Sequence, residues 1–99
     1  MNYYINGEKV VKYHFEDVLL EVISEHYEEE FDIVLDEEHP EIEIVGIKYN
    51  TSYILKTLDP IAYRTAFNDY IDNIYQDVME DLEKGQEKEI DEMFFEIKE

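Results

Sequence analysis

Residues 59–85, DPIAYRTAFNDYIDNIYQDVMEDLEKG, contain the start, the apolar face and the end of one long helix. Asp59 and Pro60 are a typical helix start, with Asp as the N-cap and Pro at the first helical position. Gly85 predicts the end of the helix. Between them, apolar side chains recur every three or four residues, which is the period of one helix face; they are Tyr63, Ala66, Phe67, Tyr70, Ile71, Ile74, Val78 and Leu82.

A second amphipathic helix is predicted upstream, from about His14. Its apolar face has the same period and comprises Phe15, Val18, Leu19, Val22, Ile23 and Tyr27. Beyond Tyr27, the alternation of Phe31, Ile33 and Leu35 is also compatible with a strand. We favour a continued helix, because the acidic side chains stay in helical phase through Asp32 and Asp36. Pro40 ends this segment in either case.

Short strands are predicted around the two helices. Asn6-Gly7 predicts a type I′ turn between two strands near the N-terminus. The β-branched segment 42–49 predicts a strand, followed by a short helical turn at 53–58 that Thr51 or Ser52 would cap. Segment 93–97 fits a strand or a helix, and we favour a strand that joins the N-terminal hairpin. The predicted fold is α+β, with two long helices packed on a small, mostly antiparallel sheet in a single domain, residues 1–99.

The charge of the chain limits its partners. It has 27 acidic and 8 basic residues, a formal net charge of −19. Such an excess lowers the stability of the folded state but keeps a protein soluble. Nucleic acids and anionic membranes are polyanions, so we expect no direct binding to either. A basic protein surface, such as a groove that normally holds nucleic acid, is the expected partner.

The absence of certain features bears on location. The chain has no cysteine, which excludes disulfides, and small secreted domains usually depend on them. Its N-terminus lacks the apolar run of a signal peptide, and no apolar stretch approaches the ~18 residues of a membrane span. We therefore expect a cytoplasmic protein.

One part of the chain resembles a known group of proteins. The segment Tyr49-Asn50-Thr51-Ser52-Tyr53-Ile54-Leu55-Lys56 leads into Leu58-Asp59-Pro60-Ile61-Ala62-Tyr63-Arg64 and then into Phe67-Asn68-Asp69-Tyr70-Ile71-Asp72. It resembles small uncharacterised acidic proteins of bacteriophages and mobile elements of Gram-positive bacteria, as does the opening Tyr-Tyr-Ile-Asn-Gly-Glu-Lys-Val. The resemblance implies an origin, and a location in the host cell, more than a mechanism. Small acidic phage proteins include inhibitors of restriction enzymes and CRISPR effectors, some of which imitate DNA.

Two lines of acidic side chains are the candidate partner-binding surface. On a helix, carboxylates three or four residues apart share one face, with about 6 Å between neighbours. Like charges at this spacing destabilise a helix by roughly 0.2–0.5 kcal/mol per pair. The lines therefore indicate either an anionic surface for a basic groove or a solvated face that only keeps the protein soluble. The first line is Asp17, Glu21, Glu25, Glu28, Glu29, Asp32 and Asp36, and the second includes Asp69, Asp77 and Glu80.

A structural role is predicted for the segment that starts the long helix. Asp59 is expected to cap it, and Arg64, the only arginine, to form an ion pair with Asp59 or Asp69. An alternative for Arg64 is an anchor in a partner's pocket. Pro60, Tyr63, Phe67 and Tyr70 complete the predicted structural set, while Tyr53 and Tyr75 are expected to be more exposed.

No enzymatic activity, cofactor or dedicated metal site is expected. The chain lacks a cysteine nucleophile, a Gly-x-Ser-x-Gly motif and a phosphate-binding glycine loop. The pairs His26 with Glu30 and Asp69 with Asp72 share helix faces, but a pair alone is a weak indication of a metal site.

Three functions are compatible with the sequence. The first is an acidic phage or mobile-element binding protein, in its sharper form a DNA-mimicking inhibitor of a host defence protein. The second is a structural or assembly module that forms a homodimer through apolar residues such as Phe94 and Phe95. The third is a protein that sequesters a small host signalling molecule, for which the few cations are a disadvantage.

Overall fold

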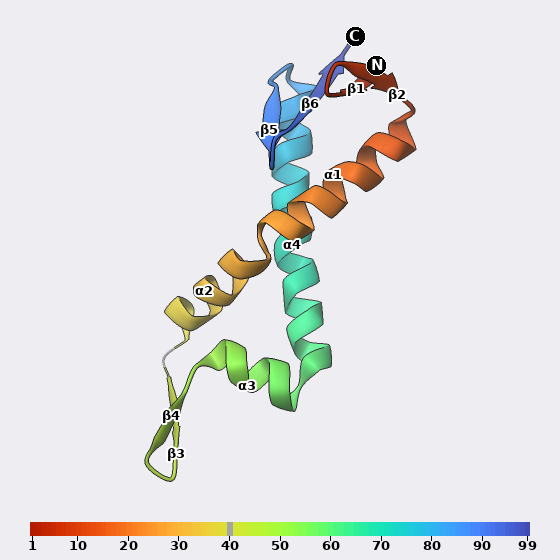
Figure 1. Cartoon of the computed structure of the whole chain (residues 1–99). Helices are drawn as coiled ribbons and strands as arrows, with labels where there is room; N and C mark the ends of the chain where they lie inside the picture. Colours follow the sequence, from red (N-terminus) through yellow and green to blue (C-terminus); the bar gives the residue numbers. More distant parts are fainter. Residues whose placement is uncertain (40) are drawn as a thin grey trace. The chain divides into compact units, whose positions relative to one another are not determined.

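The computed structural model describes residues 1–39 and 41–99, and its elements are those of an α+β fold, as predicted (Figure 1). The chain divides into two compact units, residues 1–26 with 71–99 (unit 1) and residues 27–70 (unit 2). The single domain stays a prediction. The elements are β1 (Asn2–Ile5), β2 (Glu8–Val10), α1 (Lys12–His26), α2 (Glu28–Glu38), β3 (Ile42–Ile44), β4 (Ile47–Tyr49), α3 (Thr51–Leu58), α4 (Pro60–Glu83), β5 (Lys88–Ile90) and β6 (Met93–Lys98).

Unit 1 contains a four-stranded antiparallel sheet in the order β2-β1-β6-β5. The predicted turn between β1 and β2 is confirmed, since Asn6 and Gly7 have φ angles of 52° and 81°. Asn6 also holds the C-terminal strand, because its side-chain Oδ1 accepts a hydrogen bond of 2.8 Å from the Phe94 amide. The strand predicted at 93–97 is thereby confirmed, and it pairs with the N-terminal hairpin.

The core of unit 1 is formed by both long helices and the sheet. Phe15 of α1, Leu82 of α4 and Phe95 of β6 are fully buried. The rings of Phe15 and Phe95 meet edge to face at 5.7 Å, a favourable geometry for aromatic pairs. The burial of Phe95 corrects the expectation that this residue is free to pair two copies of the chain.

The prediction of one continuous helix from His14 to Asp36 is wrong, because the helix is interrupted at Tyr27. The backbone of Tyr27 lies outside the helical region, at φ −99° and ψ 7°, and α2 begins at the next residue. Three carboxylates, those of Glu28, Glu29 and Glu30, then occupy the first turn of α2. Negative charge is favourable at a helix N-terminus but repulsive inside a helix, which favours a new helix start at this point.

Segment 42–49 is a hairpin and not the one strand that was predicted. Val45 and Gly46 form the turn, with φ angles of 52° and 78°, and they connect β3 to β4. The β-branched residues predicted strand correctly, but the glycine also marks a turn. The predicted short helix exists as α3, but it begins at Thr51 and not at Tyr53. The predicted cap is wrong, because Asn50 occupies the N-cap position and Thr51 and Ser52 lie inside the helix.

Candidate functional site

The outer face of α1 carries three of the predicted acidic residues, at intervals of one helical turn. Asp17, Glu21 and Glu25 are all exposed. None of their carboxylates makes a hydrogen bond or an ion pair with the residues that the structure describes. Each carboxylate is therefore available to a partner, at about 6 Å from the next along the helix.

Glu28 and Glu29 are also exposed, but they belong to α2 and to unit 2. The interruption at Tyr27 separates them from the face of α1. The predicted line of acidic residues from Asp17 to Asp36 is therefore not one face of one helix.

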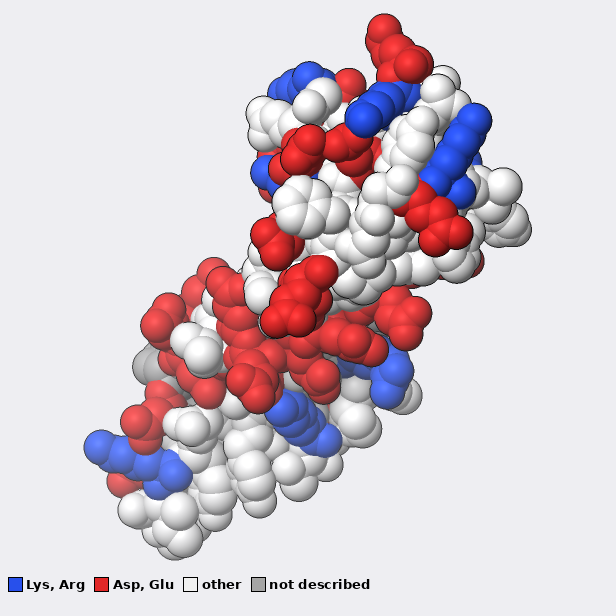
Figure 2. All heavy atoms as spheres, turned by 45° about the horizontal axis from the view of Figure 1, so that its top comes forward, with Lys and Arg blue, Asp and Glu red and all other residues white. Residues whose placement is uncertain are grey.

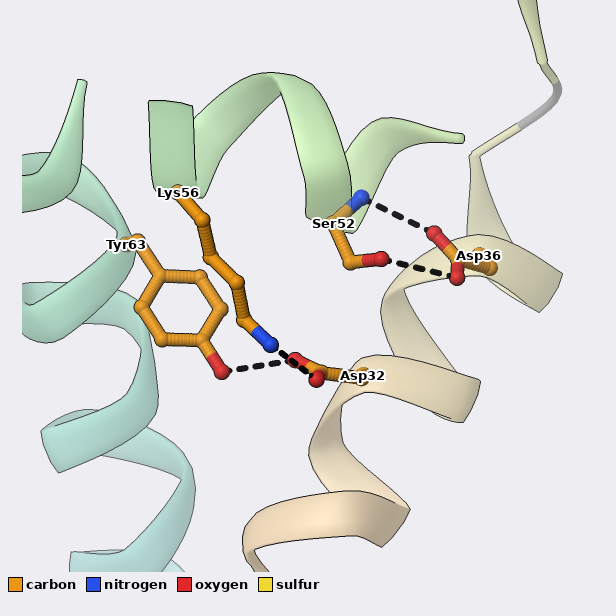
Figure 3. A network of polar contacts seen from close by, with 5 residues as sticks. All are labelled: Asp32, Asp36, Ser52, Lys56 and Tyr63. Atoms are coloured by element: carbon orange, nitrogen blue, oxygen red, sulfur yellow. Dashed lines mark hydrogen bonds and ion pairs between the residues drawn. The ribbon is translucent and has the colours of Figure 1, made fainter. Parts of the chain in front are cut away.

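Asp32 and Asp36 point into unit 2 and form a polar network with α3 and α4 (Figure 3). Asp32 pairs with the ammonium group of Lys56 and accepts a hydrogen bond of 2.6 Å from the Tyr63 hydroxyl. Asp36 accepts two hydrogen bonds of 2.9 Å from Ser52, one from the backbone amide and one from the hydroxyl. These two carboxylates hold α2 against α3, so their oxygens are engaged within unit 2 and are not free to contact a partner.

The start of α4 has the geometry of a capped helix. The side-chain Oδ1 of Asp59 accepts a hydrogen bond of 3.0 Å from the Ala62 amide, and Pro60 is the first helical residue. This cap fixes the direction of α4, which brings aromatic side chains one and two turns later onto α2.

An aromatic cluster fills the space between α2 and the first part of α4. The buried ring of Phe31 lies 5.5 Å from Tyr63, 5.4 Å from Phe67 and 5.2 Å from Tyr70, measured between ring centroids. Two of these contacts are edge to face and the third is stacked. The cluster is the packing centre of unit 2.

Two pKa shifts follow from the polar network. Burial raises the pKa of the Tyr63 hydroxyl to about 12, and the hydrogen bond to Asp32 adds to the shift. The same carboxylate, through its hydrogen bond, raises the pKa of the Lys56 ammonium. The phenol therefore stays protonated and the ammonium stays charged at neutral pH, as a structural network requires.

Tyr75 of α4 was expected to be exposed but is partly buried in unit 1. Burial raises the pKa of its hydroxyl, and the carboxylate of Glu16 on α1 raises it further, with smaller contributions from Asp17 and Glu83. Carboxylates from both α1 and α4 thus act on this one tyrosine of unit 1.

The acidic residues predicted on α4 lie on its exposed surface. Asp69 falls in unit 2, and Asp77 and Glu80 fall in unit 1. Glu80 forms an ion pair of 3.2 Å with Lys84 one turn later. Both side chains are exposed, so the pair contributes little to stability.

Arg64 does not form the predicted ion pair. Its guanidinium is exposed, and no carboxylate of the described residues, including Asp59 and Asp69, lies within ion-pair distance. The side chain borders a shallow pocket of about 330 Å³ in unit 2, which it lines together with Glu28, Lys56, Pro60, Tyr63, Phe67 and Asn68.

An apolar groove that was not predicted from the sequence lies beside the β3–β4 hairpin. The groove has a volume of about 270 Å³, and its lining residues are Ile44, Tyr49, Tyr53, Ile54, Thr57 and Leu58. Tyr49 and Tyr53 stack within it at 5.9 Å, and Tyr53 is exposed as predicted. The alternation of apolar with charged residues on both sides of Gly46 is the sequence pattern that could have predicted a hairpin with one apolar face.

Within residues 1–39 and 41–99, no three His, Asp or Glu side chains come together as a metal site would require. In the same part of the chain, no helix combines the length and apolar character needed to cross a membrane. Comparison with models of protein families, with curated proteins and with solved structures found no match to this chain.

Proposed function

We propose that this chain is a non-enzymatic acidic protein that binds a basic surface of another protein, in the manner of a nucleic-acid mimic. In its most specific form, the partner is a host defence protein, a restriction enzyme or a CRISPR effector, and the chain originates from a phage or mobile element. The observation that carries the proposal is the unpaired acidic face of α1, Asp17, Glu21 and Glu25.

The distribution of cations supports a surface with excess negative charge. Four of the eight basic residues form ion pairs with carboxylates of the same chain; they are Lys56, Lys84, Lys88 and Lys98. No Lys or Arg side chain lies on α1 after Lys12. Figure 2 shows how far acidic side chains outnumber basic ones on the face that it presents.

A basic partner would gain affinity from this surface in a salt-dependent way. Exposed carboxylates keep their hydration until a partner covers them, so attraction acts mainly on the association rate and on specificity. Screening shortens the range of such attraction to about 10 Å at 0.1 M salt. Binding should therefore weaken steeply as salt is added.

The test begins with capture of the partner. The immobilised chain is exposed to a bacterial lysate at low salt, and proteins that elute as salt rises are identified by mass spectrometry. The captured protein is then purified, and its binding to the chain is measured with and without duplex DNA. We expect the two to compete for one surface; binding of both at once would refute nucleic-acid mimicry.

Matched variants locate the binding surface. The variant Asp17→Asn, Glu21→Gln, Glu25→Gln removes three charges from the face of α1. We expect it to weaken binding about tenfold at low salt, since exposed charges contribute roughly 0.2–1 kcal/mol each. The control, in which the exposed Glu8, Glu89 and Glu99 all become Gln, has the same net charge. Equal losses in the two variants would show that the face of α1 has no special role.

A further inference from the structure

The β3–β4 hairpin of unit 2 has one charged face and one apolar face. Cross-strand partners lie on the same face of a sheet, so the pairing of residues assigns the faces. Glu43 pairs with Lys48 on one face. On the other face Ile42 pairs with Tyr49, and Ile44 pairs with Ile47.

The apolar face of this hairpin is largely open to solvent. The exposed fractions of Ile44 and Ile47 are 49% and 55%, and that of Leu58, across the groove on α3, is 73%. A two-stranded hairpin is marginally stable in water, and contiguous exposed apolar surface usually marks an interaction site. The hairpin and α3 therefore present an apolar surface that a partner would cover.

The tip of the hairpin adds a second, independent observation. Val45 has a φ of 52°, a left-handed conformation that disfavours β-branched residues and is far more favourable for Asn or Gly. Its side chain is 95% exposed. The corresponding first residue of the β1–β2 turn is Asn6, which suits that conformation. An exposed valine at such a position costs local stability without any packing gain inside unit 2.

The charge of this region identifies the kind of partner. Residues 42–58 contain one acidic residue, Glu43, and two basic residues, Lys48 and Lys56, in a chain with a net charge of −19. Lys48 lies opposite Glu43, and Lys56 is paired with Asp32. Two copies of the chain repel each other through their acidic surfaces, and this region, which lacks the acidic excess of the rest of the chain, adds little to that repulsion.

We propose that the apolar face of the β3–β4 hairpin, with the exposed side of α3, binds a second copy of this chain. The surface offers a projecting apolar tip at Val45 and an apolar groove between Ile44 and Leu58, so it is complementary to itself. A two-fold dimer uses the same patch on both copies, which such a surface allows. The contact is separate from the acidic face of α1 and goes beyond the proposed function.

The first measurement is the mass of the full chain in solution by sedimentation equilibrium, over a range of protein and salt concentrations. Added NaCl should strengthen the dimer, because it screens the repulsion between the two acidic bodies. This salt dependence is opposite to that of binding to a basic partner, so the two proposals fail independently. A chain that stays monomeric at about 0.5 mM protein in high salt would overturn the dimer.

Variants then test the surface itself. Val45→Asn should raise the dissociation constant of the dimer about tenfold while the melting temperature of the monomer rises or stays equal. The double variant Ile44→Thr, Leu58→Gln should raise it roughly a hundredfold, since each change acts twice in a symmetric dimer. The control is Val11→Asn, which removes another exposed valine from unit 1 and should leave the dimer unchanged. A dimer that survives Val45→Asn and the double variant unweakened would refute the assigned surface.

Discussion

Replacement of Asp36 by Ala tests whether the acidic residues of α2 act inside the molecule or on its surface. The Asp36 carboxylate accepts hydrogen bonds from both the amide and the hydroxyl of Ser52, which lies in the first turn of α3. Ser52 is buried, at 9% exposure. Removal of the carboxylate therefore leaves two buried donors without their acceptor, at the end of a helix where negative charge is favourable.

The magnitude follows from these contacts. A buried donor without a partner costs about 1–3 kcal/mol, and the lost interaction with the N-terminus of α3 adds about 0.3–1 kcal/mol. Because the hydroxyl can rotate toward another acceptor, we expect Asp36→Ala to lower the free energy of unfolding by about 3 kcal/mol. Asp36→Asn keeps one acceptor oxygen and should cost about 1–2 kcal/mol.

Urea unfolding measured by circular dichroism gives the free energy, and amide hydrogen exchange in α3 locates the effect. Exchange in α3 should accelerate together with the loss of stability, whereas exchange in the sheet of unit 1 should change less. The control is Glu37→Ala, an exposed neighbour on α2, which should cost under about 0.5 kcal/mol. If Asp36→Ala and Glu37→Ala had equal effects, the carboxylate of Asp36 would not hold α3.

Two further predictions concern unit 2. Phe31→Ala removes the ring that Tyr63, Phe67 and Tyr70 surround, so we expect the free energy of unfolding in urea to fall by about 3–5 kcal/mol. The control is Phe94→Ala at a half-exposed position, which should lower it by under about 1 kcal/mol. Similar losses in the two variants would show that the aromatic cluster is not the packing centre of unit 2. Stability should fall as pH rises from about 10 to about 12, because the unfolded chain releases the Tyr63 proton near the ordinary pKa of 10 and the folded chain holds it until about 12. Ultraviolet titration of the phenolates should show that Tyr63→Phe removes the last phenol to ionise as the pH rises. If a phenol of this variant still ionised near pH 12, the phenol with that pKa in the unchanged chain would not be Tyr63.

Much of the fold was predictable because its signals are local. Asn6-Gly7 suits positive φ angles wherever it occurs, and the first turn therefore formed as expected. Asp59-Pro60 combines a capping oxygen with a preset φ, and α4 accordingly begins at Pro60. Such signals depend on a few neighbouring residues and little on the rest of the chain.

The break at Tyr27 could not be read from periodicity. Phe31 and Leu35 continue the apolar spacing of α1 almost in phase, so a continuous helix and two helices joined at one residue have nearly the same pattern. The acidic run from Glu28 to Glu30 does carry a signal, because negative charge favours a helix start. Glu28 and Glu29 also fit the surface line of carboxylates on a continuous helix, so the same residues are compatible with both structures.

The sequence by itself determined the α+β class, the turn at Asn6-Gly7, the helix start at Asp59-Pro60 and the net charge of −19. Only the tertiary structure decided which carboxylates are free. Glu21 and Asp36 both occupy helix positions with helical spacing, yet one is exposed on α1 and the other is bonded to Ser52. The difference arises because the hydrogen-bond donors that reach the carboxylates of α2 come from a distant segment. Ser52 and Lys56 of α3 lie 16 and 24 residues along the chain from their partners Asp36 and Asp32. The sequence around each carboxylate does not predict that contact.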